Sequence, residues 1–498
     1  MNGSRHGLLA MACVALLLPA PLRAQEPRAI TFEDAVERAL VRSTDVLRAR
    51  AQLDASGTVQ TREKMDFLPE LSLSTRGTRS FGRSFSQAEG AILSESNDIV
   101  DAGLSVSMNL FDGLESFASL RQASLREDAN RLRLDRARED AVFQVVEGFT
   151  NLIQARELAT VREEELTAAN ELLAQVRGLV EVGRRPVSDL YQQEAAQAEA
   201  EAALVEARQQ AGLAETQLIQ TLQLDPLGEY DFVSPELPEE PAPPVDYRLE
   251  DLLELALERR SDLEAVERGY EASDEGVTMA RSGYFPSLSL SFNYGSNWSS
   301  NSLQPVPGTG TDPRVVAITP DGGGEPVMFE VPGSGTEPVF VRPDFLDQMD
   351  GRRGGSVSLS LSVPVFSGWQ TKAEVAQAEA ERLTARYDLQ DQRQLVALQV
   401  RQALLDYESA VARQGATERR RLAAERAWQA SNRRYELGAA TFVEVVQARS
   451  TLAAARSAAI QARFAVLLAQ RLIEYHTGGL DAHNASLTDS DTGRDDDR

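Results

Sequence analysis

Cysteine is almost absent from this chain: Cys13 is the only one among 498 residues. It lies in the middle of an apolar run near the N-terminus, with further apolar residues after it, so lipid attachment at this cysteine is not expected. The remainder of the chain has no disulfide, no thiolate metal site and no thiol nucleophile. Histidine is also scarce, with only His476 and His483 outside the leader segment described below. We therefore expect no metal site and no cofactor.

Positive charge is in short supply as well. The chain has 51 lysines and arginines against 76 acidic residues, which gives a net charge of −25 at pH 7. Loss of Arg5 and Arg23 with the leader would take the net charge to about −27. A protein that binds nucleic acid or anionic lipid needs the opposite sign, so the composition argues against both classes.

Long apolar segments are missing too, except at the start. Residues 1–24 combine a basic start, an apolar core and a cleavage site before Gln25, which is the pattern of a secretory signal peptide. The apolar core is too short to span a bilayer. After it no stretch of 18 apolar residues occurs, so any crossing of a membrane must be made by strands.

What the chain does contain is a duplication. Four motifs of the first half recur in the second, two at an offset of 217 residues and two at an offset of 255. The halves therefore differ by one insertion of 38 residues, placed between two strands. Such insertions are tolerated at exposed loop tips. The matched segments are 31–49 with 248–266, 67–74 with 284–291, 110–113 with 365–368, and 182–196 with 437–451.

The duplication sets the expected domain organisation: a first repeat over 25–224, a proline-rich linker over 225–247, a second repeat over 248–478 and a disordered acidic tail over 479–498. The insertion at 299–355, rich in glycine and proline, is expected to be a long surface loop. In the first repeat we expect helices over 31–67, strands over about 70–81 and 102–111, a long helix over 114–181 and a return helix over 188–223. In the second we expect helices over 249–283, strands over about 287–298 and 356–366, a long helix over 369–437 and a return helix over 441–475.

The two long helices are predicted from the absence of proline and from apolar residues at helical spacing, such as Val142 and Phe149. About 68 residues at 1.5 Å each make a rod of about 100 Å, far longer than a globular domain needs. Each rod ends at a glycine, Gly183 or Gly438, and a short turn leads to the return helix. Rod and return helix form an antiparallel hairpin, twice per chain, and Ser188 is expected to cap the first return helix.

The strands alternate serine or glycine with aliphatic residues, so that each has one apolar face. Such a face suits either a soluble core or lipid. Strand lengths near ten residues, export of the chain and aromatic residues at both strand ends favour lipid. The aromatic residues are Phe67, Phe111, Tyr284, Phe285, Phe366 and Trp369 at one end, and Phe81, Phe85, Tyr294 and Trp298 at the other.

Four strands cannot close a membrane barrel, since the smallest barrels use about eight. An open edge in lipid would leave unpaired backbone groups that each cost several kcal/mol. The chain must therefore supply a fraction of a shared barrel. Because each chain supplies four strands, barrels of about 8, 12 or 16 strands are all possible, and the strand count alone does not decide between them.

These motifs together resemble the outer-membrane efflux protein family, the TolC-like ducts of Gram-negative bacteria, over nearly all of 30–478. The resemblance rests on the strand-to-helix junctions Phe111-x-Gly113 and Phe366-x-Gly368, on "FLPELSLS" and "YFPSLSLS", and on "YELGAATFVEVVQARSTLAAAR". It implies a mixed α and β membrane protein: a homotrimer with a 12-stranded outer-membrane β-barrel, continued by a periplasmic α-helical barrel. It also implies a periplasmic adaptor protein, an inner-membrane transporter of the RND, ABC or MFS type, and export of drugs, metals or proteins.

The resemblance further implies a gate at the periplasmic tip, with a constriction ring of acidic residues. Glu444 keeps the first acidic position, whereas the second is Gln447, and an arginine of the family's closing ion-pair network is Ala440 here. Tyr435 is kept, and Asp189 stands at the place of Glu444 in the first repeat. Three Glu444 carboxylates in a trimer would favour cations, although a solvated helix acid explains Glu444 equally simply. The implied adaptor-contact turns are Val182-Gly183-Arg184 and Leu437-Gly438-Ala439.

Two rival classes remain. An enzyme or a carbohydrate-binding periplasmic protein finds no support, because the sequence has no G-x-S-x-G, H-E-x-x-H, P-loop or cysteine pair. A structural coiled-coil protein of the surface or periplasm explains the helices without transport activity, but not the strands flanked by aromatic residues. We therefore expect a passive, non-enzymatic duct whose substrate the sequence does not specify.

Overall fold

The structure is a computed structural model, and it describes residues 28–86, 91–235, 245–307, 314–318, 327–331 and 338–480. The expected signal peptide and nearly all of the expected acidic tail lie outside these residues, as do parts of the linker and of the insertion. The chain divides into two compact units, which are described separately. Unit 1 comprises residues 1–51, 132–263 and 392–498, and unit 2 comprises residues 52–131 and 264–391.

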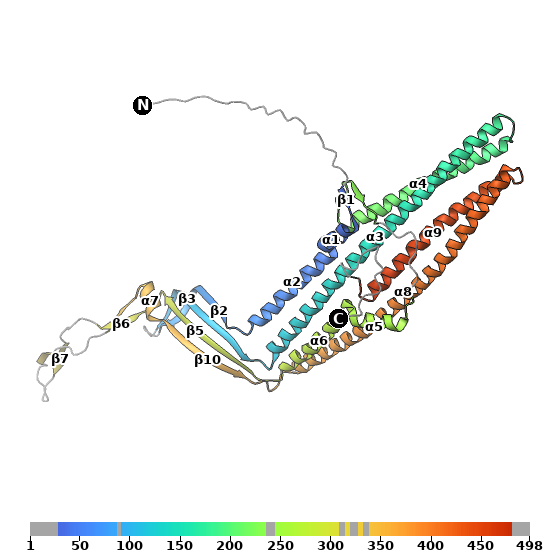
Figure 1. The fold of residues 1–498 in the computed structure, drawn as a ribbon. Helices are drawn as coiled ribbons and strands as arrows, with labels where there is room; N and C mark the ends of the chain where they lie inside the picture. Colours follow the sequence, from blue (N-terminus) through green and yellow to red (C-terminus); the bar gives the residue numbers. More distant parts are fainter. Residues whose placement is uncertain are drawn as a thin grey trace, which may run out of the picture. The chain divides into compact units, whose positions relative to one another are not determined.

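Both halves of the chain run through the same order of main elements: a short helix, a longer helix, two strands, a long helix and a return helix (Figure 1). The first half has α1 (Phe32–Arg42), α2 (Thr44–Met65), β2 (Glu70–Ser86), β3 (Ala91–Phe111), α3 (Glu115–Glu181) and α4 (Val187–Thr221). The second half has α5 (Leu249–Arg259), α6 (Ser261–Ser282), β5 (Ser287–Ser299), β10 (Gly354–Ser362), α8 (Gln370–Glu436) and α9 (Phe442–His476).

The first helical segment of each half consists of two helices, α1 with α2 and α5 with α6, within the ranges 31–67 and 249–283. The break falls at Ser43 in the first half and at Arg260 in the second, and both residues leave the helical backbone conformation, with ψ of 129° and 113°. Each break is followed by polar residues that favour helix starts, "TD" after Ser43 and "SD" after Arg260.

Unit 2 contains a four-stranded antiparallel sheet in the order β10-β5-β3-β2. The two halves of the chain meet at its centre, because β3 pairs with β2 of its own half and with β5 of the other half. The register keeps like residues on one face: Leu71 opposes Val106, which opposes Phe292. β2 and β10 are the two edges.

The apolar face of this sheet is exposed to solvent in the single chain. Leu73, Leu359 and Leu361 are 83%, 64% and 66% exposed. Burying a leucine side chain gains roughly 1.5–3 kcal/mol, so a contiguous row of bare leucines indicates a surface that meets something other than water.

The insertion is not the irregular loop that its composition predicts. Among its described residues β6 (Gln304–Pro307) pairs with β9 (Pro338–Val341), and β7 (Arg314–Ile318) pairs with β8 (Val327–Val331). A short helix, α7 (Phe345–Gly351), leads into β10. The runs "RVVAI" and "PVFV" contain β-branched and aromatic residues that favour strands, and these short runs outweigh the glycine and proline around them.

Unit 1 holds the ends of two helical hairpins, α3 with α4 and α8 with α9, in which α3 and α8 have 67 residues each. Its core lies where α3 meets α1 and β4 (Tyr230–Phe232), a strand that pairs in parallel with β1 (Arg28–Ile30). The ring of Phe149 lies edge-on to those of Phe32 and Phe232, at centroid distances of 5.5 and 5.9 Å. All three phenylalanines are fully or almost fully buried.

Within the described ranges, α9 alone has the length and hydropathy that a membrane-crossing helix needs. It nevertheless buries ten side chains in the protein, Phe464 and Ile473 among them. One guanidinium nitrogen of Arg463 in α9 also donates to both carboxylate oxygens of Glu157 in α3, at 2.5 and 2.6 Å. We interpret α9 as a packing helix, since its apolar and charged residues both have partners within unit 1.

Candidate functional site: the paired helix turns

Two turns in unit 1 share one geometry, the one between α3 and α4 and the one between α8 and α9 (Figure 1). Gly183 and Gly438 have φ of +72° and +73°, a left-handed conformation that glycine adopts without steric cost. In each turn the glycine amide donates to the carbonyl three residues earlier, and the next amide donates to the carbonyl five residues earlier. These bonds satisfy the last carbonyls of the long helix and end it sharply.

The turns differ in how the return helix begins. Thr441 caps α9: its hydroxyl accepts from the Glu444 amide while the Glu444 carboxylate accepts from the Thr441 amide. At α4 the capping position is held by Pro186, which makes no side-chain bond. The prediction that Ser188 caps α4 is wrong, because proline pre-sets the backbone for the helix start and Ser188 lies one residue inside the helix.

An apolar cluster joins the two hairpins beside their turns. It contains Val176 of α3, Tyr435 of α8, and Phe442 and Val445 of α9, none of which is more than 7% exposed. Leu190 of α4 packs against the same cluster. Each buried side chain of this size stabilises the contact by roughly 1.5–3 kcal/mol, so the hairpin ends are held together mainly by burial.

A cation lies on the rim of this cluster. The guanidinium carbon of Arg185 is 4.2 Å from the centre of the Tyr435 ring, and an Arg185 nitrogen is 3.8 Å from the carboxylate of Asp189. Burial raises the pKa of Tyr435, which therefore stays uncharged. The Tyr435 hydroxyl is buried, with no hydrogen-bond partner among the described residues. Arg185 thus connects the first hairpin to the second through the face of the Tyr435 ring, while Asp189 of its own hairpin balances its charge.

Arg185 is a residue that the sequence analysis missed. The expected closing ion pair looked weakened because Ala440 stands where the family places an arginine. An offset of 255 residues relates position 440 to position 185, so the arginine is present at the equivalent place in the other half. That offset was the available signal for finding it.

Glu444 lies exposed at the start of α9. Hydrogen bonds from Thr441 and, to a smaller extent, the charge of Arg434 lower the pKa of Glu444. The Arg434 guanidinium is 3.6 Å from the Glu444 carboxylate and also donates to the Ala439 carbonyl at 2.9 Å. Gln447, one turn further on, is exposed. The turn therefore presents one ionised carboxylate, partly compensated by Arg434.

The outermost side chains of both turns are apolar and bare. Val182 and Leu437 occupy the position before each glycine and are 68% and 83% exposed. Arg184 and Ala439, which follow the glycines, are exposed as well. A pair of equivalent apolar tips has the character of a protein contact surface rather than of a solvated turn.

The junctions between strand and helix belong to unit 2. Gly113 and Gly368 have φ of +73° and +62°, and the residues after them, Leu114 and Trp369, are left-handed as well. Two consecutive left-handed residues turn the chain from strand to helix at both junctions. Phe111 and Phe366, which precede them, are 42% and 81% exposed.

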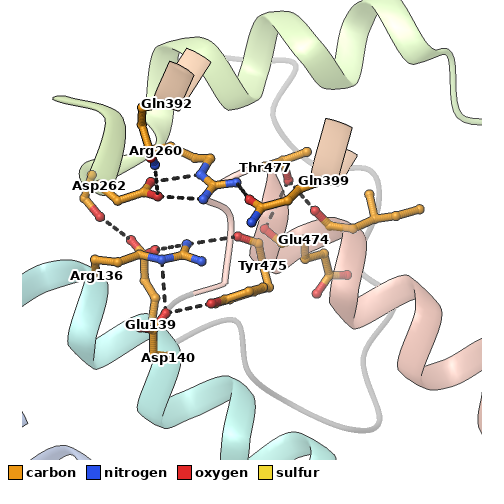
Figure 2. A network of polar contacts seen from close by, with 12 residues as sticks. Arg136, Glu139, Asp140, Arg260, Asp262, Gln392, Gln399, Glu474, Tyr475 and Thr477 are labelled. Carbon is orange, nitrogen blue, oxygen red and sulfur yellow. Dashed lines mark hydrogen bonds and ion pairs between the residues drawn. The ribbon is translucent and has the colours of Figure 1, made fainter. Parts of the chain in front are cut away.

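Unit 1 also contains a polar network at the broken end of α5, drawn in Figure 2. Arg260, whose side chain is 2% exposed, makes a bidentate bond to Asp262 at 2.9 and 2.6 Å and donates to Gln399 of α8 at 2.7 Å. Arg136 of α3 donates to the Tyr475 carbonyl at 3.4 Å, and its guanidinium lies 4.0 Å from the centre of the Tyr475 ring. The network therefore connects α3, α6, α8 and α9.

Burial and neighbouring charges together shift the pKa values of several groups in this network. Burial alone would raise the pKa of Asp262, but the bonds and charge of Arg260 outweigh it and leave that pKa lowered. Burial raises the pKa of Glu139 and, together with Asp140, takes the pKa of Tyr475 to about 12. Burial, helped by Arg260, lowers the pKa of His476 to about 4, and its Nδ1 has no partner among the described residues.

No group of three or more potential metal ligands occurs within the described ranges.

A model of the outer membrane efflux protein family matches residues 35–222 and 252–479, which is most of the chain. The chain belongs to this family. Its members are outer-membrane channels, and this chain is accordingly an efflux channel of the outer membrane whose helical part lies in the periplasm.

Curated relatives agree with this family. The chain is 23% identical to the outer membrane efflux protein BepC of Brucella suis, over 77% of this chain and 73% of the relative. It is 22% identical to the outer membrane protein TolC of Vibrio cholerae, over 85% of each.

Solved structures share the fold. CusC superposes with a TM-score of 0.72 at 16% identity, covering 90% of this chain and 92% of that one. VceC of Vibrio cholerae superposes with a TM-score of 0.70 at 18% identity, covering 90% and 96%. The MtrE channel of Neisseria gonorrhoeae, in its open state, gives a TM-score of 0.65 at 20% identity, covering 91% and 90%.

Proposed function

We propose that this chain is the outer-membrane exit duct of a tripartite efflux system or of a type I secretion system, through which substrates pass passively to the exterior. The observation that carries the proposal is the four-stranded sheet of unit 2. It has two free edges, β2 and β10, and an exposed apolar face. Such a sheet is stable in lipid only when both edges are paired.

Three chains would bring 12 strands, and we propose a homotrimer that closes one barrel. A barrel of this size leaves space for an aqueous channel, whereas barrels of about eight strands are filled by side chains. The serine-rich face of the sheet then lines the channel, and the leucine-rich face meets lipid.

The paired turns are the proposed gate and the proposed contact with a periplasmic adaptor protein, which in turn binds an inner-membrane transporter. Val182 and Leu437 supply equivalent exposed apolar tips for the adaptor. Arg185 and Arg434 hold the turn region through Tyr435 and Glu444. A trimer would place three copies of Glu444 around one axis and favour cations at the tip.

The adaptor contact is tested by placing a photo-crosslinking residue at Leu437, with Tyr191, an exposed position on α4, as control. Co-expression with a periplasmic adaptor protein from the same organism should give a cross-linked species from Leu437 only. Equal cross-linking from both positions would contradict a contact made by the turns.

The duct itself is tested on the full chain. Material extracted from outer membranes with detergent should contain three chains per particle by light scattering and should form conducting channels in planar bilayers. A water-soluble monomer without channel activity would contradict the proposal and leave the structural coiled-coil alternative.

A further inference from the structure

A cavity of about 340 Å³ lies within unit 1 between α3, α4 and α9. It adjoins the apolar cluster of the paired turns, with which it shares Leu172 and Val446. Its volume is at the small end of the range of about 300–1,000 Å³ that small-molecule sites occupy. Most of its wall is alanine, whose short side chain leaves space between the three helices: Ala169, Ala196, Ala200, Ala203, Ala453 and Ala454.

Two hydrogen-bond acceptors in this cavity have no partner among the described residues. Gln193 of α4 is 2% exposed, and its amide nitrogen donates to the Ala169 carbonyl of α3 at 3.0 Å, but its Oε1 is buried and unbonded. Glu165 of α3 accepts from Arg162 through Oε2 at 2.7 Å, while its Oε1 is likewise buried without a partner. A buried oxygen without a donor is costly, so both oxygens favour a ligand that donates hydrogen bonds.

A partly buried cation lines the same cavity. Arg449 of α9 donates through one nitrogen to the Ala168 carbonyl of α3 at 2.9 Å. Burial lowers the pKa of Arg449, and the charges of Glu165 and Glu171 offset that effect only in part. A guanidinium has five N–H groups, so Arg449 can also donate to a bound anionic group.

These three side chains converge on one stretch of α3. Ala168 and Ala169, whose carbonyls accept from Arg449 and Gln193, are successive residues. Glu165 lies one helical turn before Ala169, and residues four apart are neighbours on a helix surface. A donor and two acceptors, each from a different helix, therefore line one small space.

The duplication shows that these polar residues are not a requirement of hairpin packing. By the offset of 255 residues, the second-half equivalents of Glu165 and Gln193 are Arg420 and Ala448. The second hairpin thus forms from helices of the same length without the two acceptors.

The ionised groups along the cavity balance one another. Arg162 and Arg449 carry positive charge, and Glu165 and Glu199 carry negative charge. A lone cation or a lone anion would leave an uncompensated charge in a partly buried site, whereas a zwitterion adds no net charge.

We propose that this cavity binds a small zwitterion, an α-amino acid with an aliphatic side chain. Its ammonium group donates to the unbonded oxygens of Glu165 and Gln193, and its carboxylate accepts from Arg449. Its side chain lies against the alanine wall, Leu172 and Val446. The inference goes beyond the proposed function, since a passive duct needs no bound ligand.

Isothermal titration calorimetry of the detergent-solubilised full chain tests the ligand class with probes of similar shape. L-Leucine carries both charged groups, 3-methylbutylamine lacks the carboxylate, and 4-methylpentanoate lacks the ammonium group. L-Leucine should bind saturably, and each analogue should bind at least about tenfold more weakly because it lacks one set of charge-assisted hydrogen bonds. Absence of saturable L-leucine binding, or an analogue that binds as tightly as L-leucine, overturns the inference.

Variants place the site. Ala200→Leu fills the cavity and should abolish L-leucine binding, whereas Ala198→Leu, at an exposed position of the same helix outside the cavity, should leave it unchanged. Equal binding in these two variants overturns the inference.

Glu165→Gln decides the question if Ala200→Leu fails to fold. It keeps the size of the side chain and removes its charge, so it should weaken L-leucine binding by about tenfold or more and leave 4-methylpentanoate binding undiminished. Unchanged L-leucine binding in Glu165→Gln contradicts the assigned contact with the ammonium group and overturns the inference. Protein that conducts in planar bilayers but does not bind L-leucine overturns the inference and leaves the proposed function intact.

Discussion

Arg185 lies across the ring of Tyr435, with 4.2 Å between the guanidinium carbon and the ring centre. The two residues come from different hairpins and are separated by 250 positions in the chain. Asp189, in the first turn of α4, balances the charge of Arg185. The contact closes the open side of an otherwise apolar cluster, so it is a point at which the hairpins can be held together or released.

Replacing Arg185 by alanine is expected to loosen this contact and to increase channel opening. A cation over an aromatic ring contributes about 1 kcal/mol, which corresponds to a roughly fivefold change in the ratio of closed to open channels. Single-channel recording in planar bilayers measures this ratio. Arg184→Ala removes an arginine from the same turn without touching Tyr435 and should leave it unchanged. Similar gating in both variants would show that the ring contact has no part in closure.

Replacing Glu444 by glutamine is expected to reduce cation selectivity without altering the fold. Glutamine still accepts the Thr441 amide hydrogen bond, so the start of α9 is preserved while the charge is lost. Reversal potentials in a salt gradient give the ratio of cation to anion permeability, which should fall. Glu436→Gln removes a nearby carboxylate on α8 and serves as control. An unchanged ratio of cation to anion permeability in Glu444→Gln would show that Glu444 serves only to cap α9.

The pH dependence of that selectivity follows from the same residue. Hydrogen bonds from Thr441 lower the pKa of Glu444, so the carboxylate stays charged to a lower pH than an ordinary glutamate. Cation preference in the unmodified channel should therefore persist through mildly acidic pH and be lost only below the usual range of carboxyl groups. Loss of preference near neutral pH would assign it to another group.

The sheet and the long hairpins follow from local patterns in the sequence. Serine alternating with leucine fixes which face of a strand is apolar, and the absence of proline allows 67-residue helices. The recurrence of "FDG" and "FSG" marks where strands turn into helices. Each of these signals depends on a few neighbouring residues, which is why they could be read without coordinates.

The features of the fold and of the candidate site that the sequence did not predict depend on residues far apart in the chain. The Arg185 contact with Tyr435 needs both hairpins to be placed, and neither residue alone distinguishes a ring contact from a solvated arginine. The network that Arg260 forms at the break between α5 and α6 likewise needs Gln399 of α8, which lies 139 residues further along the chain. Composition also misled over the insertion, where short apolar runs form strands despite the glycine and proline between them.

His476 is expected to make the protein less stable in mild acid. Its pKa is about 4 in the folded chain and about 6.5 when unfolded, so folding favours the neutral ring. Stability is then complete above pH about 6.5, falls as the pH drops towards 4 and changes no further below that. Since the ring is only partly buried, solvent screening limits the loss to at most about 2 kcal/mol.

Thermal unfolding of the detergent-solubilised protein between pH 7 and pH 4.5 measures this effect. The groups around His476 include Arg136, Arg260 and Asp262, and the two arginines stay charged throughout that window. His476→Leu should flatten the decline, while His483→Gln should keep it. A decline that is identical in all three proteins would show that His476 is not the group responsible for the acid sensitivity.

Two glycines with the same backbone angle should differ in how much they tolerate alanine. Gly113 and Gly183 have φ of +73° and +72°, so either substitution puts a side chain in the left-handed region at a cost of about 1 kcal/mol. At Gly183 a Cβ meets nothing within 4 Å. At Gly113 it would lie 2.7 Å from the Ser282 carbonyl oxygen, and a backbone atom cannot move aside as a flexible side chain can.

Gly113→Ala should therefore lower the melting temperature and the yield of assembled channel clearly more than Gly183→Ala, by an additional cost of roughly 1–3 kcal/mol for overpacking. Circular dichroism of the detergent-solubilised variants follows the melting, and gel filtration gives the assembled fraction. Equal losses in the two variants would mean that only the backbone angle matters, and that the junction of β3 with α3 is less tightly packed against Ser282 than the distances indicate.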